Sequence, residues 1–369
     1  MRVKLEDVCE RGSSNLKQSD VAEMSGDYPI YGASGYIGNV DFYHQEKPYI
    51  AVVKDGAGIG RTTLHPAKSS IIGTMQYLLP KGNVLPKYLY YVVSYMHLEK
   101  YFTGATIPHI YFKDYKNEEF NLDALERQKE IVETLDKCEK IIESRKKELQ
   151  LVDDLIKARF VEMFGDAVAN PMNWPIKELK DLSVQINSGN TPKGGSENYV
   201  EEGIAFFRSQ NVWKDCLKMD DIAYIDEETH AKMKKSSLKQ GDILMTKTGR
   251  INTENSSLGR AALYMGEDDM ANVNGHVYFI RLKPEVNNKF VLRILVSDEY
   301  RDLIRSVCVG GIDKRQLNKE HIEDFPIICP PDYMVDKYVS FVDQVDKSKL
   351  MFQKLHQKLN ILQQKAGDI

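Results

Sequence analysis

The chain has 369 residues, of which 42% are hydrophobic and 28% charged, and its formal net charge is −4 with an isoelectric point near 6.1. This length suits two globular domains with connecting helices, and the charge excludes a protein that is basic throughout. The sequence has no apolar signal-peptide core and no run near the roughly 18 apolar residues that span a bilayer, which predicts a cytoplasmic protein.

Residues 1–122 predict a first domain of mixed strands and helices. Tyr49–Val53 is a short apolar strand, and the glycine loop 54–61 follows it. A helix begins near Pro86, where proline suits the first turn. Residues 102–109 form another turn, after which the domain ends.

Residues 123–165 predict one long helix. Its apolar residues recur at alternating intervals of four and three, and charged residues fill the positions between them. This 3.5-residue repeat is typical of a coiled coil, which needs a partner helix with a matching seam. The seam consists of Ile131, Leu135, Cys138, Ile142, Leu149, Val152, Ile156 and Met163.

Residues 166–330 repeat the order of the first block, and residues 331–369 repeat the long helix. The strand and loop at 241–250 resemble those at 49–61, the helix near Phe290 matches the one near Pro86, and the loop 309–315 matches 103–109. A period of about 200 residues indicates a domain duplication. The predicted fold is α+β, with two mixed α/β domains, two long antiparallel coiled-coil helices and an approximate internal two-fold relation.

The motifs of an enzyme are missing from this sequence. The glycine loop 54–61 lacks the GxGxxG spacing of a dinucleotide site and the GK[ST] of a phosphate loop. There is no Gly-x-Ser-x-Gly nucleophile elbow, no HxxxH or HExxH pair and no CxxC pair among the five cysteines. We therefore expect a reduced, non-catalytic protein that binds no metal and no cofactor of its own.

Short turns that carry lysine or arginine beside glycine recur in both blocks. Residues 47–68, 231–250 and 305–319 are locally basic although the chain is acidic overall. Lysine and arginine reach phosphates, arginine can pair with guanine, and glutamine suits adenine edges. The predicted DNA contacts are Lys54, Arg61, Thr106, His109, Lys193, Arg208, Gln210, Lys247, Arg250, Arg260, Lys314 and Arg315.

The order of these features resembles the specificity (S) subunit of type I restriction–modification systems over nearly the whole chain. The resemblance rests on both helix entries and on turn motifs in each domain. These stretches are 31–35, 56–61, 103–108, 125–132, 160–166, 187–192 and 330–331. At 331–336 the second helix entry departs from the Leu-x-x-Gln-like pattern usual in the family.

The resemblance implies two target-recognition domains, 1–122 and 166–330, that read the two halves of a split, asymmetric double-stranded DNA site. The helices 123–165 and 331–369 would act as a ruler for the unread spacer. Two modification subunits would supply S-adenosylmethionine-dependent methylation, and restriction subunits would supply ATP- and Mg-dependent translocation and cleavage. The alternative is a coiled-coil adaptor that binds protein partners, and DNA affinity that is absent or independent of salt would favour it.

Overall fold

The chain folds into two compact units. The structure, a computed structural model, describes every residue except 57, 104–107, 252, 254, 312–313 and 368–369, and it describes side chains up to Lys349. Unit 1 comprises Met1–Gln150 and Leu350–Ile369, and unit 2 comprises Leu151–Lys349. Thr106, one of the predicted DNA contacts, lies outside the described residues.

Unit 1 begins with a short strand and leads into the first long helix, which it holds as far as Gln150. Its elements are, in chain order, β1 (Arg2–Lys4), α1 (Leu5–Val8), β2 (Cys9–Ser13), α2 (Gln18–Val21), β3 (Tyr28–Gly32), β4 (Gly35–Val40), β5 (Tyr49–Val53), β6 (Thr62–His65), β7 (Ser70–Ile71), β8 (Met75–Pro80), α3 (Pro86–Tyr95), η1 (Leu98–Tyr101), α4 (Phe112–Tyr115), β9 (Glu119–Asn121) and α5 (Leu125–Phe164).

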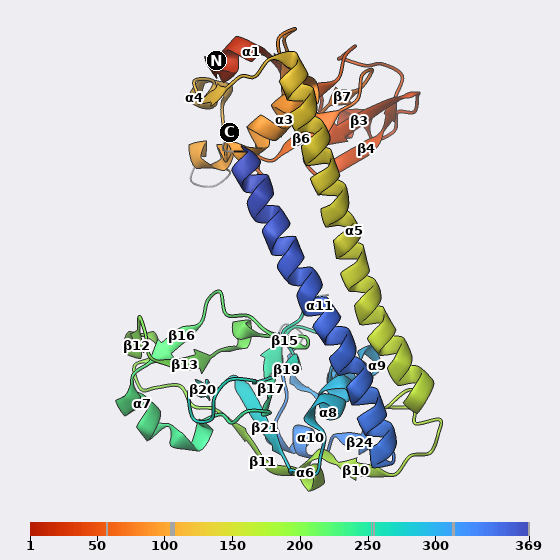
Figure 1. Cartoon of the computed structure of the whole chain (residues 1–369), viewed down its shortest axis with the longest axis vertical. Coiled ribbons are helices and arrows are strands. Elements are labelled where there is room, and N and C mark those ends of the chain that lie inside the picture. Colours follow the sequence, from red (N-terminus) through yellow and green to blue (C-terminus); the bar gives the residue numbers. More distant parts are fainter. Residues whose placement is uncertain (57, 104–107, 252, 254, 312–313, 368–369) are drawn as a thin grey trace. The chain divides into compact units, whose positions relative to one another are not determined.

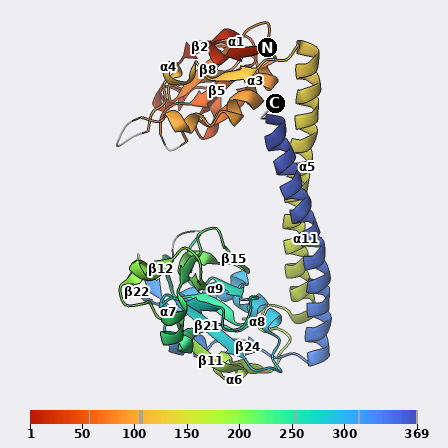
Figure 2. The same cartoon turned by 60° about the vertical axis from the view of Figure 1, so that its left-hand side comes forward.

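The centre of unit 1 is an antiparallel sheet of order β2-β8-β5-β6. In β5, Ile50 and Val52 pack with helix α3, whereas Tyr49, Ala51 and Val53 pack toward a second sheet of order β4-β3-β7. Because successive side chains of a strand point to opposite faces, a strand covered on both sides is apolar throughout. Figure 2 shows β2, β5 and β8 next to α3.

The first long helix is anchored to unit 1 near its N-terminal end. The side chain of Gln128, which is fully buried, accepts a hydrogen bond of 2.8 Å from the backbone N–H of Leu85, and its amide donates to two further backbone carbonyls. Lys87 on α3 forms an ion pair of 2.7 Å with Asp136 on α5. These contacts fix the start of the helix against the domain.

Unit 2 contains the end of α5, a second globular domain and the first half of the second long helix, up to Lys349. Its further elements are β10 (Ile176–Glu178), α6 (Leu179–Leu182), β11 (Ser183–Ser188), η2 (Gly195–Asn198), β12 (Tyr199–Val200), β13 (Ile204–Phe207), η3 (Ser209–Asn211), β14 (Val212–Trp213), β15 (Cys216–Leu217), β16 (Ala223–Ile225), α7 (Glu227–Lys232), η4 (Lys234–Ser236), β17 (Ile243–Thr246), β18 (Thr248–Gly249), β19 (Ala261–Leu263), β20 (Ala271–Val273), β21 (Val277–Leu282), α8 (Asn288–Leu295), α9 (Asp298–Val307), β22 (Val309–Gly310), β23 (Arg315–Gln316), α10 (Lys319–Glu323), β24 (Pro326–Ile328) and α11 (Asp332–Gly367).

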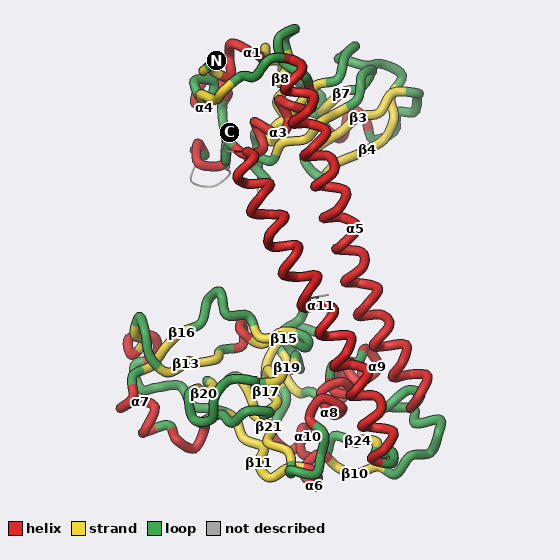
Figure 3. The backbone as a smooth tube through the Cα atoms, in the orientation of Figure 1, coloured by secondary structure: helices red, strands yellow, loops and turns green. Residues whose placement is uncertain are grey.

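The layers of unit 2 repeat those of unit 1. The central antiparallel sheet has the order β11-β21-β17-β19. Ile243 and Met245 of β17 pack with helices α8 and α9, and Leu244 packs toward a second sheet of order β12-β16-β13-β20. Figure 3 shows the strands of this unit next to its helices.

The two long helices run antiparallel where they pack together in unit 2. Lys349 on α11 pairs with Asp153 on α5 at 2.5 Å, and further along both helices the hydroxyl of Tyr338 donates to the carbonyl of Ile156 at 3.4 Å. Figure 1 shows α11 beside α5 at this unit. An aromatic cluster closes the end of the seam, with ring centroids of Phe160, Phe164, Phe290 and Tyr338 between 5.1 and 6.5 Å apart.

The matching strand orders confirm the predicted fold class and its internal duplication. When the four strands of each central sheet are numbered along the chain, their order in the sheet is first, fourth, second, third in both units. Each second sheet contains one parallel pair, β3–β7 in unit 1 and β13–β20 in unit 2. In each unit the first and last strands of the domain also form an antiparallel pair, β1–β9 and β10–β24. Each copy of the domain then continues into a long helix.

Candidate nucleic-acid interface

In unit 1, the glycine loop after β5 lies against the segment that precedes α4. The carbonyl of Lys54 accepts a hydrogen bond of 2.9 Å from the N–H of Ile110, and the N–H of Gly56 donates to the carbonyl of Pro108 at 3.0 Å. Two turns that the sequence separates by about fifty residues are thereby joined at the end of the central sheet. The two loops form a surface that the central sheet holds in place, an arrangement common in binding sites.

Several predicted contact residues of unit 1 gather on this surface. His109 Nδ1 lies 2.6 Å from Asp55 Oδ1, and the ammonium of Lys54 lies 3.9 Å from the other carboxylate oxygen. The exposed Arg61 donates through its guanidinium to the carbonyl of Ala33 in the turn between β3 and β4. The loop 54–61, the segment at His109 and the turn between β3 and β4 thus contribute to one surface, with Lys54 and His109 beside the Asp55 carboxylate.

Exposed tyrosines that were not predicted from the sequence adjoin this surface. The ring of Tyr111 lies 6.4 Å from that of His109 at an interplanar angle of 21°, and the ammonium of Lys113 lies 5.3 Å from the Tyr111 ring centre. Tyr36 on β4 is 63% exposed. Both lie in aromatic, turn-rich stretches that flank the predicted contacts, and this proximity was the signal available in the sequence.

Unit 2 repeats the backbone arrangement of this surface. The carbonyl of Lys247 accepts from the N–H of Leu317 at 2.9 Å, as Lys54 does from Ile110, and the N–H of Lys247 donates to the carbonyl of His276 at 2.8 Å. The loop after β17 therefore lies against β23, which pairs with β18 on one side and with β22 on the other in a small sheet. The two lysines occupy equivalent positions.

The side chains on the unit 2 surface are predominantly cationic. The ammonium of Lys247 lies 5.6 Å from the centre of the Tyr278 ring. Arg250 and Lys314 are both exposed. Among the described residues, Arg250 has no side-chain hydrogen bond or ion pair, so its guanidinium is free to bind an external acceptor.

The structure shifts the predicted correspondence between the two turns by one residue. Gln316 pairs with Thr248 across β23 and β18, as His109 pairs with Asp55. The counterpart of His109 is therefore Gln316, whereas the predicted Arg315 donates to a backbone carbonyl at 3.3 Å. The unit 2 turn is one residue longer than its counterpart, and Gln316 was missed for this reason.

Arg260, another predicted contact, lies in the interior of unit 2. It is 8% exposed, its guanidinium carbon lies 3.9 Å from the centre of the Trp213 ring, and its Nε donates to the carbonyl of Ser256 at 3.0 Å. Burial, and then the nearby Arg301, lower the pKa of Arg260. Its donors hold the loop 255–260 together, so we do not place it on the interface.

Arg208 and Gln210 lie at the edge of the same surface, but both are paired internally. Asp221 lies 3.1 Å from the Arg208 guanidinium and accepts from the Gln210 amide at 3.0 Å. The hydroxyl of Ser209 between them donates to the carbonyl of His276 at 3.4 Å. This bond connects the segment to the one that Lys247 contacts.

Lys193 is exposed in the loop that follows β11. Gly189, at the start of that loop, lies so close to the backbone of Val273 that a Cβ would come within 1.8 Å of the Val273 carbonyl oxygen. Only glycine permits this approach, which brings the loop next to the segment containing His276. The start of the loop that carries Lys193 therefore borders the unit 2 surface.

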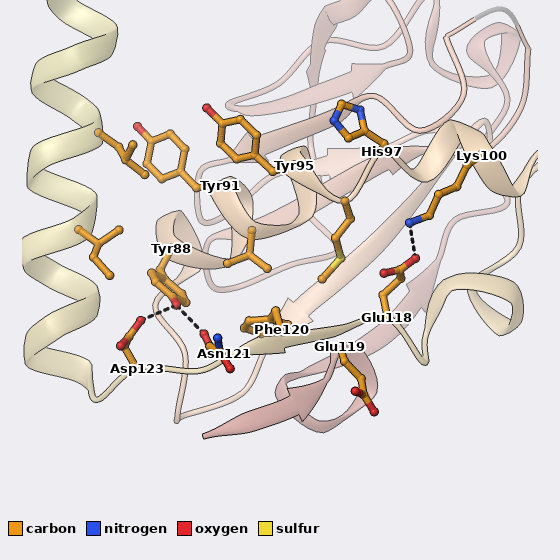
Figure 4. Close-up of a pocket in the computed structure, with 14 residues that line it drawn as sticks. Tyr88, Tyr91, Tyr95, His97, Lys100, Glu118, Glu119, Phe120, Asn121 and Asp123 are labelled. Atoms are coloured by element: carbon orange, nitrogen blue, oxygen red, sulfur yellow. Dashed lines mark hydrogen bonds and ion pairs between the residues drawn. The ribbon is translucent and has the colours of Figure 1, made fainter. Parts of the chain in front are cut away.

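Unit 1 also has a cavity of about 400 Å³ that lies among α3, β9 and α5 (Figure 4). The hydroxyl of Tyr88 donates to the carbonyl of Asn121 and to the carboxylate of Asp123, both at 3.0 Å, on its wall. In unit 2, Phe290 occupies the place of Tyr88, and Phe160 and Phe164 pack on it. The described residues of unit 1 provide no such aromatic pair.

No group of histidine, cysteine and carboxylate side chains among the described residues could hold a metal ion. Within the same residues, no helix is long and apolar enough to cross a membrane. The two candidate surfaces described above lie at the ends of equivalent sheets and carry lysine and arginine side chains, together with His109 in unit 1 and Gln316 in unit 2.

The fold defines a protein with two copies of one mixed α/β domain, each of which carries a loop surface at the end of its central sheet and is followed by a long helix. The sequence profile of the type I restriction modification DNA specificity domain matches residues 1–153 and 171–363, one stretch for each copy. The chain therefore belongs to this family.

Similarity to individual proteins agrees with this assignment. The chain is 23% identical over 277 residues to the type I restriction enzyme MjaVIII specificity subunit of Methanocaldococcus jannaschii, a match that covers 71% of this chain and 64% of that protein. It is 24% identical over 292 residues to the MjaIX specificity subunit of the same organism, covering 72% and 63%. The chain thus spans less than two thirds of the length of these relatives. The fold is also similar to that of the type I restriction–modification S subunit from M. genitalium, with a TM-score of 0.58, 15% identity and coverage of 100% of this chain and 95% of that chain.

Proposed function

We propose that this chain reads a bipartite, asymmetric DNA site, with one half-site for each unit. The observation that carries the proposal is the repeated backbone arrangement around Lys54 and Lys247, which presents different side chains in the two units. Equivalent lysines serve for phosphate contact in both halves, and the differing neighbours provide two different readings of bases. The side chains proposed to contact bases are Arg61 and His109 in unit 1, and Arg250 and Gln316 in unit 2.

In this proposal the chain supplies specificity and no catalysis. Methyl transfer, translocation and cleavage belong to two modification subunits and to restriction subunits, and S-adenosylmethionine, ATP and Mg are bound by those partners. The names of the relatives and the family of the chain support this division of labour. The cytoplasm is the compartment in which such a complex meets DNA.

The test is co-expression with a modification subunit from the same genome, followed by genome-wide mapping of methylated adenines. We expect a split motif with a fixed gap that disappears when this chain is omitted. Methylation that does not depend on this chain would contradict the proposal and favour an adaptor that binds protein partners.

The long helices are proposed to set the length of the unread gap. Inserting seven residues after Ile142 preserves the heptad seam and adds about 10 Å of helix. At about 34 Å per turn of DNA, we expect the methylated motif to gain roughly three unread base pairs. An insertion of seven residues between Lys81 and Gly82, in a loop of unit 1, is the control and leaves the gap unchanged. A gap that is insensitive to the helix insertion would refute the ruler.

A further inference from the structure

We infer that His109 and Gln316 are equivalent specificity-determining residues, one for each half-site, and that each reads the edge of a single base pair. This inference rests on the proposed function and extends it to particular side chains. Its basis is the juxtaposition in each unit of the lysine loop with the strand segment that carries this residue. The position directly precedes Ile110 in unit 1 and Leu317 in unit 2, the residues that bond to the two lysines.

The imidazole of His109 is held in one orientation. Its backbone forms two hydrogen bonds of 2.8 Å with Thr103, its Nδ1 bonds to Asp55 at 2.6 Å, and its ring lies beside that of Tyr111. The side chain is nevertheless 37% exposed. Because Nδ1 faces the carboxylate, Nε2 is the ring atom left for an external partner, and no described residue bonds to it.

Gln316 is held in a comparable way. Its amide nitrogen donates to Asn318 Oδ1 at 3.2 Å, and its backbone pairs with Thr248 on one side and Val309 on the other. The side chain is exposed, and among the described residues no group bonds to its amide oxygen. The oxygen and the second amide hydrogen remain available, which is the pair of groups that binds adenine N6 and N7.

The neighbours of both positions fit a base reader beside phosphate contacts. Lys54 and Lys247 lie on the adjoining loop in the two units, where their ammonium groups can neutralise the DNA backbone. A pinned side chain loses little conformational freedom on binding, so more of its hydrogen-bond energy discriminates between bases. In unit 1, the tautomer in which Nδ1 donates to Asp55 leaves Nε2 to accept from an exocyclic amino group, adenine N6 or cytosine N4.

The test uses the full chain with its modification subunit and maps the methylated motif of His109→Gln and of Gln316→His. We expect each variant to change its preference at one base pair by about tenfold, within the range for a single base contact. The other half-site and the gap stay as in the wild type. The two variants alter opposite halves.

Matched controls come from residues of the same types outside the interface. His97 also pairs with a carboxylate, Glu99 at 3.2 Å, and Gln240 donates to the carbonyl of Met265 at 3.4 Å. His97→Asn, which suits the left-handed backbone at this position, and Gln240→His leave the motif unchanged.

The outcomes distinguish this inference from the proposed function. A wild-type chain that yields no split motif would refute the proposed function itself. A split motif that neither His109→Gln nor Gln316→His changes, in complexes that assemble and methylate, would overturn the inference alone. A change in both half-sites caused by one variant would also overturn it, because that result indicates an effect on assembly.

Discussion

The two units have equivalent backbone hydrogen bonds at the end of their central sheets, but the arginine at one equivalent position is exposed in unit 1 and buried in unit 2. In unit 1 the carbonyl of Arg61 accepts from Val53 at 2.9 Å, and in unit 2 the carbonyl of Arg260 accepts from Thr246 at the same distance. Arg61 is exposed, whereas Arg260 is covered by Trp213. Backbone hydrogen bonds therefore fix where a residue lies, and its tertiary neighbours decide whether its side chain reaches solvent.

A second contrast concerns the helix that each domain packs against. In unit 2 the cluster around Phe164 fills the space between α8 and the long helices, whereas the described side chains of α3, β9 and α5 in unit 1 line the cavity of Figure 4. We therefore expect truncation of Phe164 to destabilise unit 2.

The largest expected effect comes from Phe164→Ala. Phe164 is fully buried, and truncating such a residue costs about 3–5 kcal/mol of unfolding free energy. Both tryptophans of the chain, Trp174 and Trp213, lie in unit 2, so their fluorescence during denaturant unfolding measures this unit. Tyr95→Ala, at the half-buried wall of the unit 1 cavity, is the control and leaves the tryptophan transition in place. Equal shifts of the tryptophan unfolding transition for Phe164→Ala and Tyr95→Ala would contradict the expected role of Phe164 in unit 2.

A smaller effect separates the two equivalent arginines. Arg260→Ala removes the stacking on Trp213 and the bonds to loop carbonyls, and we expect it to destabilise unit 2 by about 1–3 kcal/mol. Arg61→Ala changes the unfolding free energy by less than about 0.5 kcal/mol, as is usual for an exposed residue. Denaturant titration followed by circular dichroism measures both. A destabilisation by Arg61→Ala as large as that by Arg260→Ala would contradict the difference in burial.

The smallest expected effect is a change in salt dependence. Lys54→Ala and Lys247→Ala should each reduce the slope of log affinity against log salt by about one, because each removes one phosphate contact. DNA binding by the assembled complex at several salt concentrations measures the slope. Lys17→Ala, an exposed lysine outside the glycine loop, is the control and leaves it unchanged. A change of the salt slope for only one of the two substitutions would contradict the proposal that Lys54 and Lys247 make equivalent phosphate contacts.

The sequence was sufficient for the architecture and for the duplication because both depend on patterns within the chain. The heptad seams predicted the long helices, and the apolar run Tyr49–Val53 predicted the strand β5. The side-chain environments could not be predicted in the same way. Trp213 reaches Arg260 from a hairpin far from it in sequence, and an extra residue in the unit 2 turn moved the counterpart of His109 to Gln316.

The most direct test of the account compares Arg61→Ala with Arg250→Ala in complexes that contain the modification subunit, by mapping the methylated motif of each. The account predicts that Arg61→Ala weakens or relaxes one half-site and that Arg250→Ala affects only the other half-site. Loss at both halves from either substitution would contradict the claim that each unit reads its own half of the site.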